Sequence, residues 1–141
     1  MPENIHDSLT TCVGSTPLVR LQRCFPFHDR QVIAKLEMLN PAGSMKDRPA
    51  RYIIEQGLAS GQLRPGMRLV ESTSGNLGVA LATMARLNGL SFTAVVDPKT
   101  TSTNLRLLRT KRAAAHPIFH EIGRRRSRLE AASGVLPTWV Q

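Results

Sequence analysis

Length, composition and charge bound what this chain can be. Its 141 residues are 41% hydrophobic and 21% charged, which leaves room for one domain with a modest core. The formal net charge of +9 is uneven, because residues 109–141 carry 7 Lys/Arg against 2 Asp/Glu. The excess therefore describes the C-terminal segment and gives no general argument for nucleic-acid binding.

The same inspection argues against a membrane or secreted protein. No apolar run approaches membrane-spanning length, and the first ten residues lack the pattern of a secretion signal. Cys12 and Cys24 are the only cysteines and form no disulfide framework, which is typical of a reducing compartment. We expect a cytoplasmic protein without a membrane or nucleic-acid partner.

Strand and helix signals alternate along the chain. The expected strands are 31–38, 68–71 and 91–96, and the expected helices are 46–60, 78–88 and 102–109. Such alternation predicts an α/β fold, with a parallel sheet and crossover helices. The run 79–87 is apolar nearly all round, so its helix should be buried.

A lysine stands where the first expected helix begins. The segment 40–48 reads Asn-Pro-Ala-Gly-Ser-Met-Lys-Asp-Arg, and Ser44 and Asp47 have the spacing of a capping box that would start the helix at Met45. Pro49 favours a later start, which would leave Lys46 on the loop. In both cases the positive helix end disfavours an ammonium, and a neutral lysine amine is what Schiff-base chemistry needs.

A second loop is rich in hydrogen-bond donors. Residues 71–78, Glu-Ser-Thr-Ser-Gly-Asn-Leu-Gly, follow an expected strand and precede the apolar helix. Free backbone N–H groups, hydroxyls and an amide at a helix start suit a carboxylate or phosphate. An ordinary capping loop is the alternative, with Thr73 capping the helix and Gly75 permitting a tight turn.

Together the two loops resemble a known family. Gly14 to Leu21 matches an opening motif, Lys35 to Arg48 a cofactor-lysine motif, and Ser72 to Asn76 a substrate-carboxylate loop. In this order and spacing they are similar to the pyridoxal-phosphate (PLP) enzymes of the cysteine synthase and tryptophan synthase β-chain type, fold type II. The resemblance implies a three-layer α/β fold, a parallel sheet with flanking helices, and the family's usual homodimer.

One branch of that family matches more closely. His6 to Leu9, Met45 to Ala50, Glu71 to Gly78 and Val96 to Lys99 resemble the siderophore-type N-(2-amino-2-carboxyethyl)-L-glutamate synthases, which make a precursor of 2,3-diaminopropionate. Ordinary cysteine synthases usually carry threonine at the position of Leu77. Leucine cannot donate a hydrogen bond, so one carboxylate contact is absent or replaced by backbone.

The resemblance assigns roles to the matching residues. Lys46 would hold PLP through a Schiff base and then act as the base that removes the Cα proton. Thr73, Ser74, Gly75 and Asn76 would bind the substrate carboxylate, and Asn76 would also lie near the cofactor's 3-hydroxyl. The implied reaction is β-replacement on an activated serine: O-phosphoserine with L-glutamate or, as the alternative, sulfide giving cysteine. No metal site is expected.

The resemblance covers about residues 6–108, the N-terminal part of a β-replacement domain. We expect 109–141 to be a disordered or out-of-frame basic tail, because a frameshift would end the family pattern in this way; a genuine short protein or inactive remnant is the alternative. The family's downstream Gly-rich phosphate loop is not found. His116 and His120 have helical metal-pair spacing that Pro117 interrupts, and the arginines at 124–128 suit a solvated tail better than a nucleic-acid site.

Overall fold

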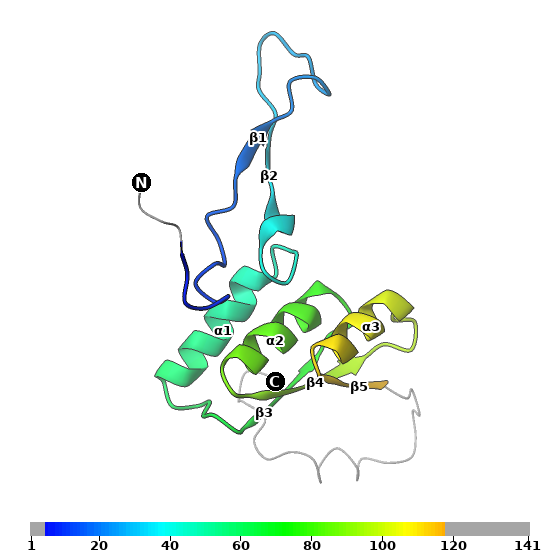
Figure 1. The fold of residues 1–141 in the computed structure, drawn as a ribbon. Coiled ribbons are helices and arrows are strands. Elements are labelled where there is room, and N and C mark those ends of the chain that lie inside the picture. The colour runs from blue at the N-terminus through cyan, green and yellow to red at the C-terminus, as the bar shows by residue number, and fades with distance from the viewer. Residues whose placement is uncertain (1–4, 118–141) are drawn as a thin grey trace.

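The computed structural model describes residues 5–117, and Figure 1 shows their arrangement. Three parallel strands form a sheet in the order β3-β4-β5: β3 is Arg68–Ser72, β4 is Ser91–Val96 and β5 is Ala114–Pro117. Leu69 pairs with Phe92, and Thr93 pairs with Ala114. The predicted α/β class with a parallel sheet is confirmed.

Three helices lie on one side of this sheet (Figure 1). They are α1 (Asp47–Ala59), α2 (Asn76–Leu87) and α3 (Ser102–Thr110). The predicted helices agree with these bounds to within two residues at each end. Helix α2 lies between α1 and α3 and packs on β3 and β4. Both crossovers, β3–α2–β4 and β4–α3–β5, advance the sheet in one direction, so right-handed connections bring their helices to the same face.

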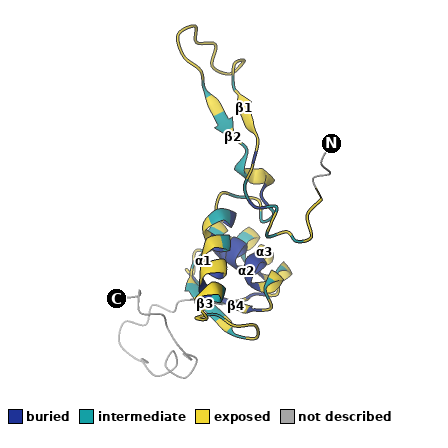
Figure 2. Ribbon diagram, turned by 90° about the vertical axis from the view of Figure 1, so that its left-hand side faces the viewer, coloured by how far each residue is buried: buried dark blue, intermediate teal, exposed yellow. Residues whose placement is uncertain are grey.

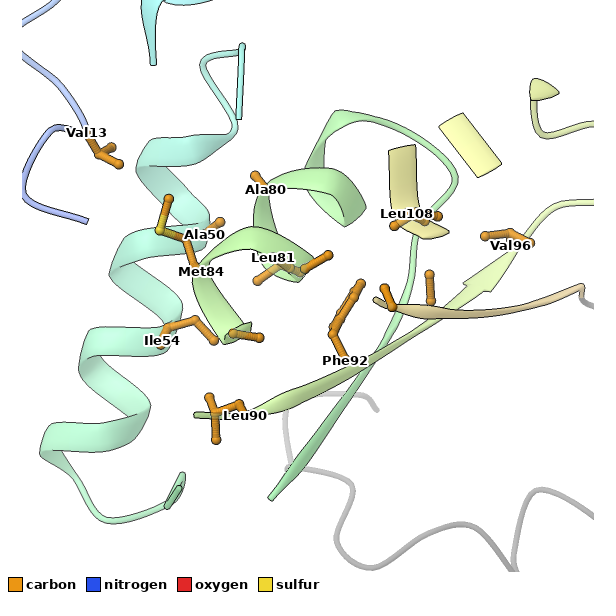
Figure 3. Packing of buried hydrophobic residues seen from close by; sticks show 14 residues of the cluster. Val13, Ala50, Ile54, Ala80, Leu81, Met84, Leu90, Phe92, Val96 and Leu108 are labelled. Atoms are coloured by element: carbon orange, nitrogen blue, oxygen red, sulfur yellow. The ribbon is translucent and has the colours of Figure 1, made fainter. Parts of the chain in front are cut away.

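The core lies around α2. Its residues Gly78–Ala85 are all buried, as predicted from the apolar run. Figure 3 shows Ala50 and Ile54 of α1 pointing toward Ala80 and Met84 of α2, while Phe92 rises from β4 beneath them. The alanines let the backbones of α1 and α2 approach closely, which places the beginnings of the two helices side by side. No helix within residues 5–117 is long and apolar enough to span a membrane.

The first strand pair stands apart from this body. β1 (Leu18–Arg20) and β2 (Ile33–Lys35) form an antiparallel hairpin that projects away from the helices (Figure 1). Most of it is exposed or half-buried (Figure 2). The prediction of a strand over 31–38 in the parallel sheet is wrong. Strand β2 ends at Lys35, and Glu37–Leu39 forms a short 3-10 helix, η1. The Glu37 side chain there accepts a hydrogen bond from Arg48 of α1.

Two strands were missed by the sequence patterns. β1 has only three residues, and all of them are exposed, so no alternation of polar and apolar positions marks it. β5 begins with alanines, which have low strand propensity, and forms through backbone pairing with β4. It lies within the segment 109–141, which was expected to be a disordered or out-of-frame basic tail, and for residues 114–117 the expectation of disorder is wrong because they pair with β4. The arginines at 124–128 and His120 lie outside the described residues.

Candidate functional site

Lys46 occupies the residue immediately before α1. Helix α1 begins at Asp47, between the two starts that the sequence allowed, so Lys46 is its N-cap. The Lys46 backbone N–H donates to Ser44 Oγ at 3.2 Å, which holds the residue at the loop–helix junction. Its side chain is exposed and makes no hydrogen bond or ion pair within residues 5–117. The amine therefore stands without an acidic partner in the described part of the chain.

The loop before Lys46 is fixed from beneath by Asp47. This carboxylate is fully buried and accepts the N–H of Ala42 at 2.5 Å and that of Ser44 at 3.2 Å. The bond to Ser44 is the second half of the capping box that the spacing predicted. Because a buried carboxylate holds two loop N–H groups, the backbone on both sides of Lys46 has one defined path.

A second polar cluster joins η1, the loop at Thr16 and α1. Arg48 donates through Nε to Glu37 Oε2 at 2.8 Å and through Nη2 to Oε1 at 2.9 Å, a bidentate pair. The Glu37 carboxylate also accepts from the Thr16 hydroxyl at 2.6 Å and from Asn40 Nδ2 at 2.9 Å. Arg48 and then Thr16 lower the pKa of Glu37 to about 2. The cluster connects the hairpin to the residues flanking Lys46.

The second candidate loop follows β3 and opens α2. The Thr73 N–H donates to the carbonyl of Val95 at 2.9 Å, so the loop leaves the sheet only after this bond. Thr73 Oγ1 accepts the N–H of Gly78 at 3.1 Å, which is a capping role. A Cβ on Gly78 would lie 2.8 Å from Thr73 Cγ2, so only glycine allows this close approach. The capping interpretation of Thr73 is correct as far as its hydroxyl is concerned.

The backbone of this loop is left open to a ligand. Within the described residues, the N–H groups of residues 74–77 have no hydrogen-bond acceptor. The N-cap Gly75 offers no side chain, and the first turn of α2 has no acidic residue. The Leu77 side chain packs against the core, but its backbone N–H is one of the four without an acceptor. Four N–H groups at a positive helix end form a cradle for an anion.

One acidic residue comes shortly before this loop in the chain. Glu71 lies two residues before Thr73, is half-buried, and forms no ion pair within residues 5–117. Burial raises the pKa of Glu71.

The predicted site residues fall into two neighbouring groups. Four of them, Thr73 to Asn76, lie at the start of α2. The fifth, Lys46, lies at the start of the neighbouring helix α1. Helices α1 and α2 run side by side with their N-termini at the same end of the layer (Figure 1), so both groups lie at that end. No hydrogen bond joins Lys46 to the loop within the described residues.

Sequence patterns missed several residues that shape this end of the molecule. Asp47, Glu37 and Arg48 lie within the matched motifs, but their mutual contacts depend on the path of η1. Asn104 of α3 donates to the carbonyl of Ser74 at 2.8 Å. A polar residue four positions before the buried Leu108, on the same helix face, was the available signal.

Comparison with known proteins agrees with this geometry. The family model described as "Pyridoxal-phosphate dependent enzyme" matches residues 9–136. The chain belongs to this family. Family members carry PLP as cofactor, and an exposed amine beside an anion cradle is a suitable donor set for it. Among residues 5–117 there is no group of three or more His, Cys, Asp or Glu side chains that could hold a metal ion.

Named relatives of this PLP family narrow the resemblance. The chain is 60% identical over 105 residues to an N-(2-amino-2-carboxyethyl)-L-glutamate synthase of Ralstonia nicotianae, covering 74% of this chain and 31% of that protein. It is 57% identical over 103 residues to the synthase of the same name from Cupriavidus metallidurans, covering 73% and 30%. The chain thus spans about a third of the length of these curated relatives.

Solved structures of the family share the fold. A crystal structure of O-ureido-L-serine synthase superimposes with a TM-score of 0.79 at 37% identity, covering 91% of this chain and 40% of that one. The fold type II assignment made from the motifs is confirmed.

Proposed function

We propose that this chain is part of a PLP-dependent β-replacement enzyme that acts on an activated serine. The proposed substrates are O-phospho-L-serine and L-glutamate, and the products are N-(2-amino-2-carboxyethyl)-L-glutamate and phosphate. The names of the two curated relatives support the choice of substrates. The observation that carries the proposal is the set of open N–H groups at residues 74–77 beside the start of α1.

In this proposal the residues 73–76 bind the substrate. The N–H groups of the loop donate to the carboxylate of the amino acid, and the hydroxyl of Ser74 and the amide of Asn76 add side-chain donors. Asn76 is exposed, which suits its further role beside the cofactor's 3-hydroxyl. Leu77 supplies a backbone N–H where a threonine would add a hydroxyl.

Lys46 would carry the covalent and proton-transfer chemistry. When bound, PLP supplies an electron sink for negative charge at Cα of the substrate. Lys46 Nζ holds the cofactor between turnovers, and its neutral amine then takes the Cα proton as a general base. No acidic side chain within residues 5–117 pairs with the Lys46 amine, so no ion pair has to break before it reacts.

The attacking nucleophile separates this proposal from its alternatives. A cysteine synthase would use the same lysine and carboxylate loop with sulfide as nucleophile. A catalytically inactive remnant would keep the loop without turning over any substrate. Leu77 supports the glutamate-using enzyme over the cysteine synthase, because it packs against the core where a threonine would offer a hydroxyl.

The surroundings of the enzyme are also part of the proposal. We expect a homodimer, and exposed apolar side chains on α1 support an association surface, with Tyr52 at 65% exposure and Ile53 at 36%. Cys12 and Cys24 are both free thiols, which supports a reducing, cytoplasmic setting.

An absorbance experiment tests the proposal. The purified chain is mixed with PLP, and the visible spectrum is recorded before and after O-phospho-L-serine, with Lys46→Ala as control. We expect a Schiff-base band that requires Lys46 and that changes on adding O-phospho-L-serine. Glutamate and sulfide are then compared as second substrates by mass spectrometry of the product. A spectrum that is the same in both proteins would reject the role of Lys46 and favour the inactive remnant.

A further inference from the structure

Helix α3 reaches the candidate carboxylate loop through one side chain. Asn104 Nδ2 donates to the carbonyl oxygen of Ser74 at 2.8 Å, across 30 residues of sequence. The bond is partly buried, so water competes for it less than at the surface. It is the one hydrogen bond between α3 and residues 73–77 within the described chain.

The position of Asn104 is itself fixed. Leu108, one turn later on the same face, is fully buried and lies close to Gly78 at the start of α2. The Thr101 hydroxyl accepts the Asn104 N–H at 3.3 Å and caps α3. Helix α3 therefore offers the Asn104 amide from a rigid support rather than from a loop.

The bond to Ser74 determines where the next N–H points. All described peptide bonds are trans, so the C=O of Ser74 and the N–H of Gly75, which belong to one planar peptide group, face opposite ways. When Asn104 holds the carbonyl toward α3, the Gly75 N–H is directed away from α3. That N–H is one of the four that have no acceptor.

Glycine makes this control necessary. Gly75 has no side chain, and the space where its Cβ would lie is empty to 4 Å, so no side chain at this position restrains the peptide group. A glycine peptide in open space can rotate between orientations at low cost. Without Asn104, the Ser74–Gly75 peptide would lose its only interaction outside the loop.

We infer that Asn104 is a positioning residue for substrate binding: it orients the Ser74–Gly75 peptide so that the Gly75 N–H donates to the substrate carboxylate. This inference rests on the proposed function, in which residues 73–76 bind that carboxylate. Asn104 itself does not touch the substrate.

The test compares two asparagines in the same protein. Asn104→Leu removes the bond to Ser74, whereas Asn88→Leu removes a bond of the same kind and length, from Nδ2 to the Met84 carbonyl at 2.8 Å, at the opposite end of α2. Amide resonances of the ¹⁵N-labelled 141-residue chain are followed during titration with O-phospho-L-serine. Asn104→Gln keeps a donor on a longer arm and serves as the conservative variant. Thermal melts show that each variant is folded.

We expect Asn104→Leu to shift and broaden the Gly75 amide resonance without ligand and to weaken O-phospho-L-serine binding roughly threefold to tenfold. Asn88→Leu should change the melt but neither of these two readouts, and Asn104→Gln should restore part of the affinity. An unchanged Gly75 resonance in folded Asn104→Leu, or wild-type affinity, overturns the inference. A changed resonance together with wild-type protein that binds no O-phospho-L-serine rejects the proposed function instead, and leaves the orientation of Gly75 by Asn104 standing.

Discussion

The starts of α1 and α2 lie side by side but treat their backbone N–H groups in opposite ways. At α1 the N–H groups of residues 46–48 bond to Ser44 or Met45, and Pro49 has no N–H to satisfy. At α2 the N–H groups of residues 74–77 have no acceptor in the described chain. One helix start is complete within the protein, and the other is complete only with water or an anion.

This difference separates two tasks. A closed start with a buried carboxylate holds Lys46 on a fixed backbone, so the amine is presented from a rigid point. An open start costs the protein some stability but offers preorganised donors to a ligand. The proposed function needs both helix starts, because Lys46 at the start of α1 must reach a substrate whose carboxylate is bound at the start of α2.

The largest expected effect comes from opening the closed start. Asp47→Ala removes a fully buried carboxylate and leaves the N–H groups of Ala42 and Ser44 without their acceptor. We expect the free energy of unfolding to fall by about 3 kcal/mol. Urea unfolding measures it, and the control Asp29→Ala, in an exposed ion pair of the hairpin, should change it little. Equal losses in the two variants would contradict the closed start.

The next effect comes from distorting the open start. In Gly78→Ala the new Cβ meets Thr73 Cγ2 at 2.8 Å, so the loop must move. We expect a loss of about 1–2 kcal/mol in stability, after the better helix propensity of alanine is counted, together with weaker binding of O-phospho-L-serine. Gly75→Ala is the matched control, since its Cβ meets nothing within 4 Å. If both alanines behave alike in urea unfolding, the close approach of Thr73 is not what requires glycine.

A smaller effect concerns the cluster that supports the closed start. The pKa of Glu37 is lowered to about 2, so between this value and its ordinary pKa near 4.5 the unfolded chain binds more protons than the folded one. The stability that Glu37 contributes is present above about pH 4.5 and is lost as the pH falls toward 2.

Urea unfolding of wild type and Glu37→Gln across this range tests that contribution. The difference between the two should shrink as the pH is lowered through the window. Glu55→Gln, which removes the charge of an exposed pair with Arg51 on α1, is the control and should show little pH-dependent difference. A difference between wild type and Glu37→Gln that stays constant with pH would contradict the lowered pKa.

The smallest expected effect is the response of the two starts to a simple anion. Sulfate should shift the amide resonances of residues 74–77 more than those of 46–48, because only the former lack an acceptor. A ¹⁵N spectrum with added sodium sulfate measures it, with sodium chloride at equal ionic strength as control. Equal shifts at both starts would show that the contrast does not govern anion binding.

Much of the fold could be predicted from the chain because its helices carry strong signals. The apolar run at 79–87 and the stop at Asn88-Gly89 define α2. The spacing of Ser44 and Asp47 predicts a start of α1 at Met45, two residues before the observed start at Asp47. The hairpin and β5 could not be predicted, since β1 is short and exposed and β5 consists of two alanines, a histidine and a proline. Their pairing depends on partners distant in the chain.

For the candidate site, the residues could be predicted from the sequence but their hydrogen bonds could not. Lys46 and the loop 73–76 stand out by residue type and position, and their roles stay predictions. The sequence does not reveal which oxygen atoms accept hydrogen bonds from the backbone N–H groups at the two helix starts. That Ser44 satisfies the start of α1 while nothing satisfies the start of α2, and that Asn104 reaches Ser74, emerges only once the chain is folded.

The placement of α2 between the other two helices has a consequence for how the protein forms. The hairpin pairs Leu18 with Lys35 with no helix between its two strands, so this pairing does not depend on a crossover. The pairing of Arg68 with Ser91 must wait until α2 has closed the crossover between β3 and β4. The open N–H groups stand at the start of the helix that supplies most of the core, so packing α2 on the sheet also places these donors.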